Sequence, residues 1–430
     1  MERPSSPLFA LAVAIGAGAC TGSITDDPER TSIEPTAPTS ESGSDDAGPP
    51  RGGDAAREDS AIAQDAAARG DSAIAEDASP SDSGAGVDAA KGVDAGPTDA
   101  GPTKPGDNRL VGYYANWTRS TMPPSSIPWA QLTHIAHAFV LPSATGSLRD
   151  LASYVDAELI SAAHAHGVKV VASIGGAGAS FAAMTSASGR AALIADAVTL
   201  CKTYGYDGAD IDWEFPDAST GASWASLISE LRTAFDAIDP KLTISAAIAS
   251  GSYYGQHLPT PGLAALDWIG VMTYDYAGEW SATSGHDSPL FPSKGGDGGS
   301  VSESLDYMMK TRGLAAGKVL VGLPFYGHQF GTSSLDSTPV APSTGMDYRD
   351  ILPLIDKSGW SRAWDASAKV PYLSRPASPG FLSYDDAPSI REKCTYAKAK
   401  GVGGAIIWHL AGDRLSDGSN PLLTEAQGCR

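Results

Sequence analysis

The sequence predicts an α/β fold, a (β/α)8 barrel that follows a segment unable to form a core. After residue 107, short apolar runs alternate eight times with helical patterns. The runs are apolar on both faces, as buried parallel strands are. Aromatic residues are nearly absent before Tyr113 and frequent after it. An open doubly wound sheet would have fewer strands and a glycine-rich first turn, and residues 113–117 are Tyr-Tyr-Ala-Asn-Trp.

Residues 1–20 are typical of an export signal, in which a short apolar run, 8–19, ends in small residues. The run is shorter than the about 20 residues of a membrane-spanning helix. Cys20 follows as in a bacterial lipoprotein signal, where that cysteine is lipidated, although Ala17 replaces the usual larger aliphatic residue and Glu2 dilutes the basic end. We therefore expect an exported protein, at the bacterial cell surface or outer membrane through Cys20. Plain secretion is the alternative, and any contact with a membrane is expected only through this lipid anchor.

Residues 21–106 predict a disordered acidic linker of Ala, Asp, Gly, Ser, Pro and Thr. Its short repeats, such as 59–66 and 71–78, lack the apolar residues that stacked repeats need. From Ser23 to Gly106 the chain has 18 Asp and Glu against 6 Lys and Arg, so this segment carries −12 of the total charge of −20. The acidic balance excludes nucleic acid as an expected partner, and we expect a monomer.

Residues 107–430 form the expected catalytic barrel, whose helices show one apolar face each. In the segment that begins after a Thr220 cap, Trp224, Leu227, Ile228, Leu231, Phe235 and Ile238 share such a face. Glycine ends several helices just before a strand, at positions 167, 205 and 401. The eight expected strands are Leu110–Ala115, Leu132–Val140, Val168–Ile174, Tyr206–Glu214, Lys241–Ala249, Trp268–Tyr274, Lys318–Tyr326 and Val402–Trp408.

One connection is too long for a helix alone. Between the last two strands, only Ala387–Lys400 is needed for the helix that returns to the barrel. The rest, roughly 331–383, predicts a small inserted subdomain between strand seven and helix seven. It would lie at the rim where barrel enzymes bind substrate.

The cysteines give one expected disulfide and no metal site. If Cys20 is lipidated, Cys201, Cys394 and Cys429 remain, and an odd number leaves one free thiol. Cys201 has helical spacing with apolar neighbours and predicts a core residue, so Cys394–Cys429 is the expected pair in an exported protein. No Cys or His spacing indicates a metal, and we expect no cofactor.

The fourth strand carries three carboxylates on one face. Because side chains alternate across a strand, Asp210, Asp212 and Glu214 point one way while Ala209, Ile211 and Trp213 point the other. Carboxylates about 6–7 Å apart repel one another, which raises a carboxyl pKa and produces a general acid. The alternative is a buried ion-pair network, and the strand contains no Lys or Arg.

These residues resemble family 18 of the glycoside hydrolases, the chitinases and their relatives, over 109–413. Asp207–Glu214 resembles the family's DxxDxDxE signature, Ser173–Gly176 its SxGG, and Met272–Asp275 its MxYD, with a tryptophan, Trp408, ending strand eight. The inserted region, with 364–365, 370–372 and 381–385, resembles a shortened form of the family's α+β insertion.

The resemblance implies hydrolysis with retention, assisted by the substrate's own acetamido group. Glu214 would protonate the leaving oxygen and later activate water. Asp212 would orient the acetamido N–H, Asp210 would support Asp212 with Ser173 and Tyr113, and Tyr274 would donate to the acetamido oxygen. The expected substrate-binding residues are Tyr113, Trp117, Phe139, Ser173, Met272, Asp275, Trp280, Tyr348 and Trp408.

Several of these assignments have simpler alternatives. Ser173 could only satisfy a strand end, Phe139 could be core, and Tyr114 could take the role of Tyr113. Trp364 is assigned to the core of the insertion. His137 and His409 depart from the family pattern and receive no role.

The expected activity is that of a chitinase acting on chitin or chito-oligosaccharides. The same chemistry on N-glycans or bacterial cell-wall glycans is one alternative, although such relatives often lack the insertion. A sugar-binding protein without catalysis is another, but Glu214 is present. An adhesin would leave the acidic strand unexplained. The sequence does not distinguish cleavage inside a chain from cleavage at its end, and does not give the product length.

Overall fold

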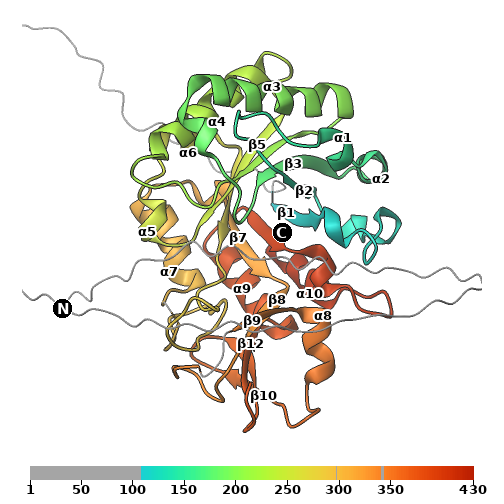
Figure 1. Ribbon diagram of the computed structural model, residues 1–430. Helices are drawn as coiled ribbons and strands as arrows, with labels where there is room; N and C mark the ends of the chain where they lie inside the picture. Colours follow the sequence, from blue (N-terminus) through green and yellow to red (C-terminus); the bar gives the residue numbers. More distant parts are fainter. Residues whose placement is uncertain (1–107, 297, 340–342) are drawn as a thin grey trace, which may run out of the picture. The chain divides into compact units, whose positions relative to one another are not determined.

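A computed structural model describes residues 108–296, 298–339 and 343–430. Within these residues eight parallel strands close into a barrel, in the order β1-β13-β7-β6-β5-β4-β3-β2 (Figure 1). The predicted barrel is therefore confirmed. The signal, Cys20 and the linker lie outside the described residues. No helix in the described part of the chain is long and apolar enough to cross a membrane.

Each barrel strand lies within or next to its expected range. The strands are β1 Arg109–Ala115, β2 His134–Val140, β3 Lys169–Gly175, β4 Gly208–Asp212, β5 Thr243–Ala249, β6 Trp268–Met272, β7 Val319–Pro324 and β13 Gly404–Trp408. β4 ends at Asp212, so Glu214 lies just beyond the strand at its carboxyl end. A barrel displays such residues at its mouth.

Helices cover the outside of the barrel. They are α1 Leu151–Tyr154, α2 Ala157–Ala165, α3 Ala187–Tyr204, α4 Gly221–Asp236, α5 Ser252–Gly255, α6 Thr260–Ala265, α7 Val301–Asp306 and α9 Ala387–Ala399. Ala209, Ile211 and Trp213 of the fourth-strand segment pack into this outer layer, as the alternation predicted. Glycines 167, 205 and 401 follow α2, α3 and α9 with positive φ, the left-handed conformation that ends a helix.

The start and end of α4 differ from the prediction. Thr220 precedes the helix but its side chain does not cap it, because its hydroxyl donates to Asp217 Oδ1 at 2.8 Å. Asp217 also accepts the Thr220 backbone N–H, so the aspartate organises this turn. The helix ends at Asp236, and Ile238 is exposed rather than part of the apolar face.

The insertion is a five-stranded antiparallel sheet with the order β10-β11-β12-β8-β9. Its strands are β8 Tyr326–Phe330, β9 Thr344–Asp347, β10 Ser361–Asp365, β11 Val370–Ser374 and β12 Phe381–Tyr384, and α8 Tyr348–Ile351 follows β9. The sheet includes β8, so it begins at Tyr326, earlier than the predicted 331. Tyr326 was expected to end a barrel strand, but β7 stops at Pro324.

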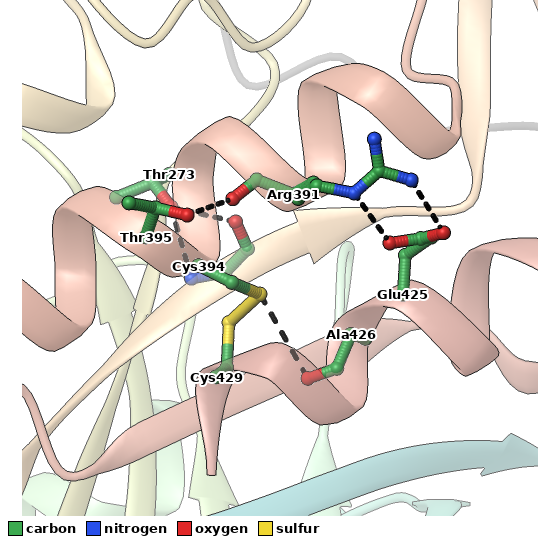
Figure 2. The surroundings of a disulfide bond; sticks show 8 residues. Thr273, Arg391, Cys394, Thr395, Glu425, Ala426 and Cys429 are labelled. Atoms are coloured by element: carbon green, nitrogen blue, oxygen red, sulfur yellow. Dashed lines mark hydrogen bonds and ion pairs between the residues drawn. A yellow bond between two sulfur atoms is a disulfide. The ribbon is translucent and has the colours of Figure 1, made fainter.

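The C-terminal segment is fastened to α9 by a disulfide and an ion pair (Figure 2). Cys394 on α9 is bonded to Cys429, the pair expected from the sequence, and Cys201 is free. Arg391, one turn before Cys394, donates to both carboxylate oxygens of Glu425 on α10 Pro421–Ala426, at 3.0 and 2.7 Å. The C-terminal segment is therefore attached to α9 at two points, one covalent and one ionic.

Candidate active site

The three carboxylates of the fourth-strand segment, here called the carboxylate ladder (Asp210, Asp212 and Glu214), lie at increasing height toward the barrel mouth. Asp210 is fully buried and Asp212 is 4% exposed, while Glu214 is half-buried. The ladder therefore leads from the barrel interior to a group that a substrate can reach.

Asp210 is surrounded by hydroxyl donors. Tyr113 donates to its Oδ2 at 2.8 Å and Ser173 to the same oxygen at 2.9 Å, while Ser245 donates to Oδ1 at 2.7 Å. The register explains the two serines, because Ser173 and Ser245 are the partners of Asp210 on the neighbouring strands β3 and β5. Parallel strands place these three side chains at one level of the barrel interior.

Asp212 has small neighbours and a free oxygen. Its register partners are Gly175 on β3 and Ala247 on β5. A Cβ on Gly175 would lie 2.0 Å from the backbone oxygen of Asp212, so only glycine fits beside it. The Oδ1 atom of Asp212 is buried and has no hydrogen-bond partner among the described residues. This carboxylate can accept or donate one more hydrogen bond.

The pKa values of all three carboxyls of the ladder are raised. Burial raises the pKa of Asp210, opposed by its hydroxyl donors. Burial, followed by the charges of Glu214 and Asp210, raises the pKa of Asp212 well above its usual range. Burial and the charge of Asp275 raise the pKa of Glu214 to about 7. A carboxyl that is protonated near neutral pH is able to act as a general acid.

Tyr274 follows β6 and faces the same carboxylates. Burial and the charges of Asp212, Asp275 and Glu214 raise its pKa well above the usual value, so it keeps its proton. Gly322 on β7 makes room for the ring, because a Cβ there would lie 2.8 Å from Tyr274 Cε1. Tyr274 is therefore a neutral hydrogen-bond donor beside the ladder.

Aromatic rings line the opposite part of the mouth. Trp408 stacks on Phe139 with 5.4 Å between ring centroids, and Trp117 lies 6.2 and 6.3 Å from these two rings. Trp117 is 48% exposed. Phe139 and Trp408, together with Met272, pack against the inner core of the barrel. These residues form an apolar floor with an exposed edge.

Asp275 belongs to a second charged cluster. Its Oδ1 accepts from Tyr326 at 2.7 Å and lies 2.9 Å from His328 Nε2. Its backbone N–H donates to Asp287 Oδ1 at 3.0 Å. Trp280 lies edge-on to His328 at 5.6 Å. Burial, more than the charge of Asp275, raises the pKa of Asp287 to about 8 against the opposing effect of His328.

Among the described residues, this is the one cluster of side chains that could hold a metal ion. Asp275, Asp287 and His328 offer ligand atoms within 4.8 Å of one another. The shortest contacts, however, pair a donor with an acceptor at hydrogen-bond distance. We therefore interpret the group as an ion-pair cluster.

The structure brings together all but one of the predicted site residues. Tyr348 is 5% exposed and stacks on Tyr384 in the core beneath the insertion, so the prediction that it binds substrate is corrected. It follows β9 directly, and its backbone N–H donates to the carbonyl of Phe325, between β7 and β8, at 2.9 Å.

Contacts distinguish Tyr113 from Tyr114 and locate the two histidines. Tyr114 points outward and donates to the Met122 carbonyl. Tyr113 is therefore the tyrosine whose hydroxyl donates to Asp210. His137 lies in the barrel wall, 2.8 Å from the Tyr206 hydroxyl, and His409 lies 3.5 Å from an oxygen of Asp347.

Four residues of the site were missed by sequence reasoning. Ser245 has a detectable signal, since it falls at the same level of strand five as Asp210 of strand four. Tyr326, His328 and Asp287 have none, because their meeting depends on how the insertion sheet folds back over the loop after β6.

The fold and this site define a class: a (β/α)8 barrel with a glycosidase-type carboxylate ladder at its mouth. The family model "Glycosyl hydrolases family 18" matches residues 109–413, and the chain belongs to this family. Chitinase A1 of Niallia circulans is 32% identical over 276 residues, covering 56% of this chain and 39% of that protein. Endochitinase 1 of Metarhizium robertsii is 28% identical over 349 residues, covering 70% and 81%.

Solved structures show the same architecture. Catalytic domain 2 of the Ostrinia furnacalis Group II chitinase, as a mutant in complex with penta-N-acetylchitooctaose, superimposes with a TM-score of 0.67 at 26% identity. The match covers 74% of this chain and 95% of that one. A family 18 N-acetylglucosaminidase from Paenibacillus barengoltzii gives a TM-score of 0.67 at 25% identity, covering 75% and 99%.

Proposed function

We propose that this protein is a chitinase that hydrolyses β-1,4 bonds between N-acetylglucosamine units with retention of configuration. The observation that carries the proposal is the carboxylate ladder, in which Glu214, with a pKa raised to about 7, stands above a buried Asp212 with one unpaired oxygen. The relatives named above as chitinases and the solved chitinase complexed with a chito-oligosaccharide support the substrate class.

In the proposed reaction Glu214 first acts as the general acid. It donates its proton to the glycosidic oxygen as that bond breaks, and the acetamido oxygen of the same sugar bonds to C1. The product of this step is a cyclic oxazolinium ion, and Glu214 is left as a carboxylate. It then takes a proton from water, which attacks C1 and reopens the ring with net retention.

Asp212 and Tyr274 are proposed to hold the reacting acetamido group. The unpaired Oδ1 of Asp212 accepts the acetamido N–H and stabilises the positive charge that develops on it. Tyr274, a neutral donor, hydrogen-bonds the acetamido oxygen and directs it to C1. Asp210, held by three hydroxyls, fixes Asp212 from below.

The aromatic residues are proposed to bind the sugar chain. The apolar C–H face of a pyranose packs on an indole ring, so Trp408 forms the floor under the cleaved sugar and Trp117 supports the chain farther out. Met272 lines the pocket of the acetamido methyl group. Trp280 and Asp275 bind on the other side of the mouth.

A second candidate is release of N-acetylglucosamine from other glycans, including N-glycans and cell-wall chains. The N-acetylglucosaminidase from Paenibacillus barengoltzii, which shares the fold, favours this alternative. A sugar-binding protein without catalysis is the third candidate, and the presence of Glu214 argues against it. We also propose that the protein works as an exported monomer, attached to the cell surface through a lipid on Cys20.

The first test is turnover of the N-acetylglucosamine tetramer by the full chain and by Glu214→Gln. We expect the wild type to release the dimer with the β configuration, detected by NMR. The variant should lose about a thousandfold or more in kcat, because the general acid is gone. Glu230→Gln is the control, since Glu230 lies on α4 and pairs with Arg190. A wild type that binds but does not cleave the tetramer would rule out the chitinase.

Substrate assistance has its own test. A tetramer of glucosamine lacks the acetamido oxygen that attacks C1, so we expect the wild type to leave it uncut. Cleavage at a rate comparable to that of the acetylated tetramer would refute the proposed intermediate while leaving Glu214 as the acid.

A further inference from the structure

We propose that His328 is a positioning residue of the active site. From β8 in the insertion it holds the carboxylate of Asp275, and its positive charge offsets the charges of Asp275 and Asp287 beside Glu214. This inference rests on the proposed function, because the role of Asp275 is to bind the sugar that Glu214 helps to cleave.

The contacts fix Asp275 from two sides. His328 Nε2 lies 2.9 Å from Asp275 Oδ1, and the Tyr326 hydroxyl donates to the same oxygen at 2.7 Å. On the other side Asp287 Oδ1 accepts the Asp275 backbone N–H at 3.0 Å. Asp275 itself has a positive φ of 59°, which an aspartate adopts only at some cost. The neighbouring donors and acceptor hold it there.

The imidazole ring of His328 has little freedom. Its side chain is 9% exposed, and Trp280 and Tyr326 each lie edge-on to it at 5.6 Å. Nε2 faces oxygens of two carboxylates, at 2.9 Å for Asp275 and 3.8 Å for Asp287. Nε2 therefore has to carry a proton, because a lone pair there would face the lone pairs of the carboxylate.

The carboxylates around Nε2 favour the charged ring, whereas Nδ1 is buried without a hydrogen-bond partner among the described residues. Burial opposes the charge, but the hydrogen bond to Asp275 and the charges of Asp287, Asp275 and Glu279 outweigh it and raise the pKa of His328 above the usual value. In the described part of the chain, no Lys or Arg forms an ion pair with Asp275 or Asp287.

The cations of the elements packed against β8 form their ion pairs with other carboxylates, although Lys393 also interacts with Asp287 electrostatically. β9 contributes Asp347, whose carboxylate is paired with Arg349. β12 is followed by Asp385, which is paired with the buried Lys393. These two cations already have partners, so among the described residues His328 is the one cationic side chain that pairs with Asp275.

His328 affects the pKa of the general acid, Glu214, through the charge of Asp275. The charge of Asp275 helps to raise the pKa of Glu214. A protonated His328 offsets part of that charge. Removing the cation should therefore raise the pKa of Glu214 further and keep the acid protonated to higher pH. A residue with only a structural role would lower activity equally at every pH.

The test compares His328→Gln and His328→Arg over a full pH profile with the N-acetylglucosamine tetramer. Gln keeps a donor without the charge, so we expect KM to rise about tenfold and the basic limb of kcat/KM to move up by about half a pH unit or more. Arg keeps the charge, so we expect a KM within about threefold of the wild type and no upward shift. His166→Gln, at an exposed position on the barrel's outside, is the control.

A measurement without turnover covers the case in which the variants fold poorly. The ring resonances of His328 in the wild type should titrate above about pH 6.5, and replacing Asp275 by Asn should lower that midpoint. EDTA should leave activity unchanged. A loss of activity on adding EDTA would mean that Asp275, Asp287 and His328 bind a metal ion instead of forming an ion pair.

The outcomes of the two proposals are distinguishable. A wild type that does not cleave the tetramer defeats the proposed function, whatever the histidine titration shows. A cleaving wild type whose His328→Gln variant keeps the wild-type KM and pH profile defeats the positioning role alone.

Discussion

The carboxylate ladder, which includes Glu214, and a second group of carboxylates next to the insertion are neutralised in different ways. Asp287 and Asp385 in the second group are buried, whereas the side chain of Asp275 is 43% exposed. The carboxylate ladder on the β4 side relies on protons and on hydroxyl donors from Tyr113, Ser173 and Ser245. The insertion-side group, here Asp275, Asp287 and Asp385, relies on the cations His328 and Lys393.

The difference follows from what each group has to do. A fixed cation beside the ladder would stabilise the ionised carboxylates and remove the proton that the reaction needs. Among the described residues no Lys, Arg or His forms an ion pair with the ladder. The insertion-side group binds the sugar through Asp275 and transfers no proton in the proposed reaction, so a fixed cation suits it. Substitutions at Lys393, Asp212 and Ser245 test this difference.

The largest effect is expected from Lys393→Met. The Lys393 ammonium is fully buried and donates to Asp385 at 2.6 Å and to Ser288 at 2.7 Å. Ser288 in turn donates to the backbone carbonyl of Thr273, next to Tyr274. Without the lysine, Asp385 is a buried charge with no cation, which costs about 3–5 kcal/mol. Denaturant unfolding of the full chain measures the loss.

Lys310→Met is the matched control, because its ammonium is largely exposed in an ion pair with Asp306. It should change the free energy of unfolding by less than about 0.5 kcal/mol. Adding Asp385→Asn to Lys393→Met should recover part of the loss. A Lys393→Met variant as stable as the control would show that the insertion-side group does not depend on its cation.

Asp212→Asn should raise the free energy of unfolding at alkaline pH, whereas Lys393→Met lowers it. We expect kcat to fall about a hundredfold, because the charge that stabilises the acetamido group is lost. A carboxyl whose pKa is raised on folding favours the folded state at low pH, and this advantage is lost as pH rises through the folded pKa. The asparagine variant should therefore unfold less readily than the wild type at about pH 8.

Unfolding curves at two pH values check this sign. Near about pH 3, where Asp212 is protonated in both states, the variant and the wild type should have similar stability. Asp236→Asn, at an exposed ion pair with Arg232 on α4, is the control. A variant less stable than the wild type at about pH 8 would mean that Asp212 is stabilised by its neighbours, like the insertion-side group.

The contrast also marks what the sequence could predict. The alternation of apolar runs predicted the barrel, and period-two spacing predicted that Asp210 and Asp212 share a face, because both patterns are local. Ser173 was predicted from the SxGG motif of Ser173–Gly176. Ser245 could have been found from strand register, since it pairs with Asp210 across β4 and β5.

The insertion-side group had no such local signal. Tyr326 was expected to end a barrel strand and instead begins the insertion sheet, which brings it and His328 to Asp275. Tyr348 was expected to face the substrate, but the same sheet buries it in the core. Contacts between segments fifty residues apart depend on how the sheet packs on the barrel, and a period in the sequence does not contain that information.

The smallest predicted effect separates the two groups at a single hydrogen bond. Ser245→Ala removes one of three hydroxyl donors from Asp210, a cost of about 1 kcal/mol, or about fivefold in kcat, with KM unchanged. Tyr326→Phe is the matched change on the insertion side, and there His328 still holds the same oxygen of Asp275. We expect it to change KM rather than kcat, because Asp275 binds the sugar but does not transfer the proton. Combining Ser245→Ala with Ser173→Ala should cost something other than the sum of the single losses, since both hydroxyls act on one carboxylate. If Tyr326→Phe lowered kcat as much as Ser245→Ala, the carboxylate ladder and the insertion-side group would form one coupled network. The distinction between a group that keeps protons and a group paired with cations would then be wrong.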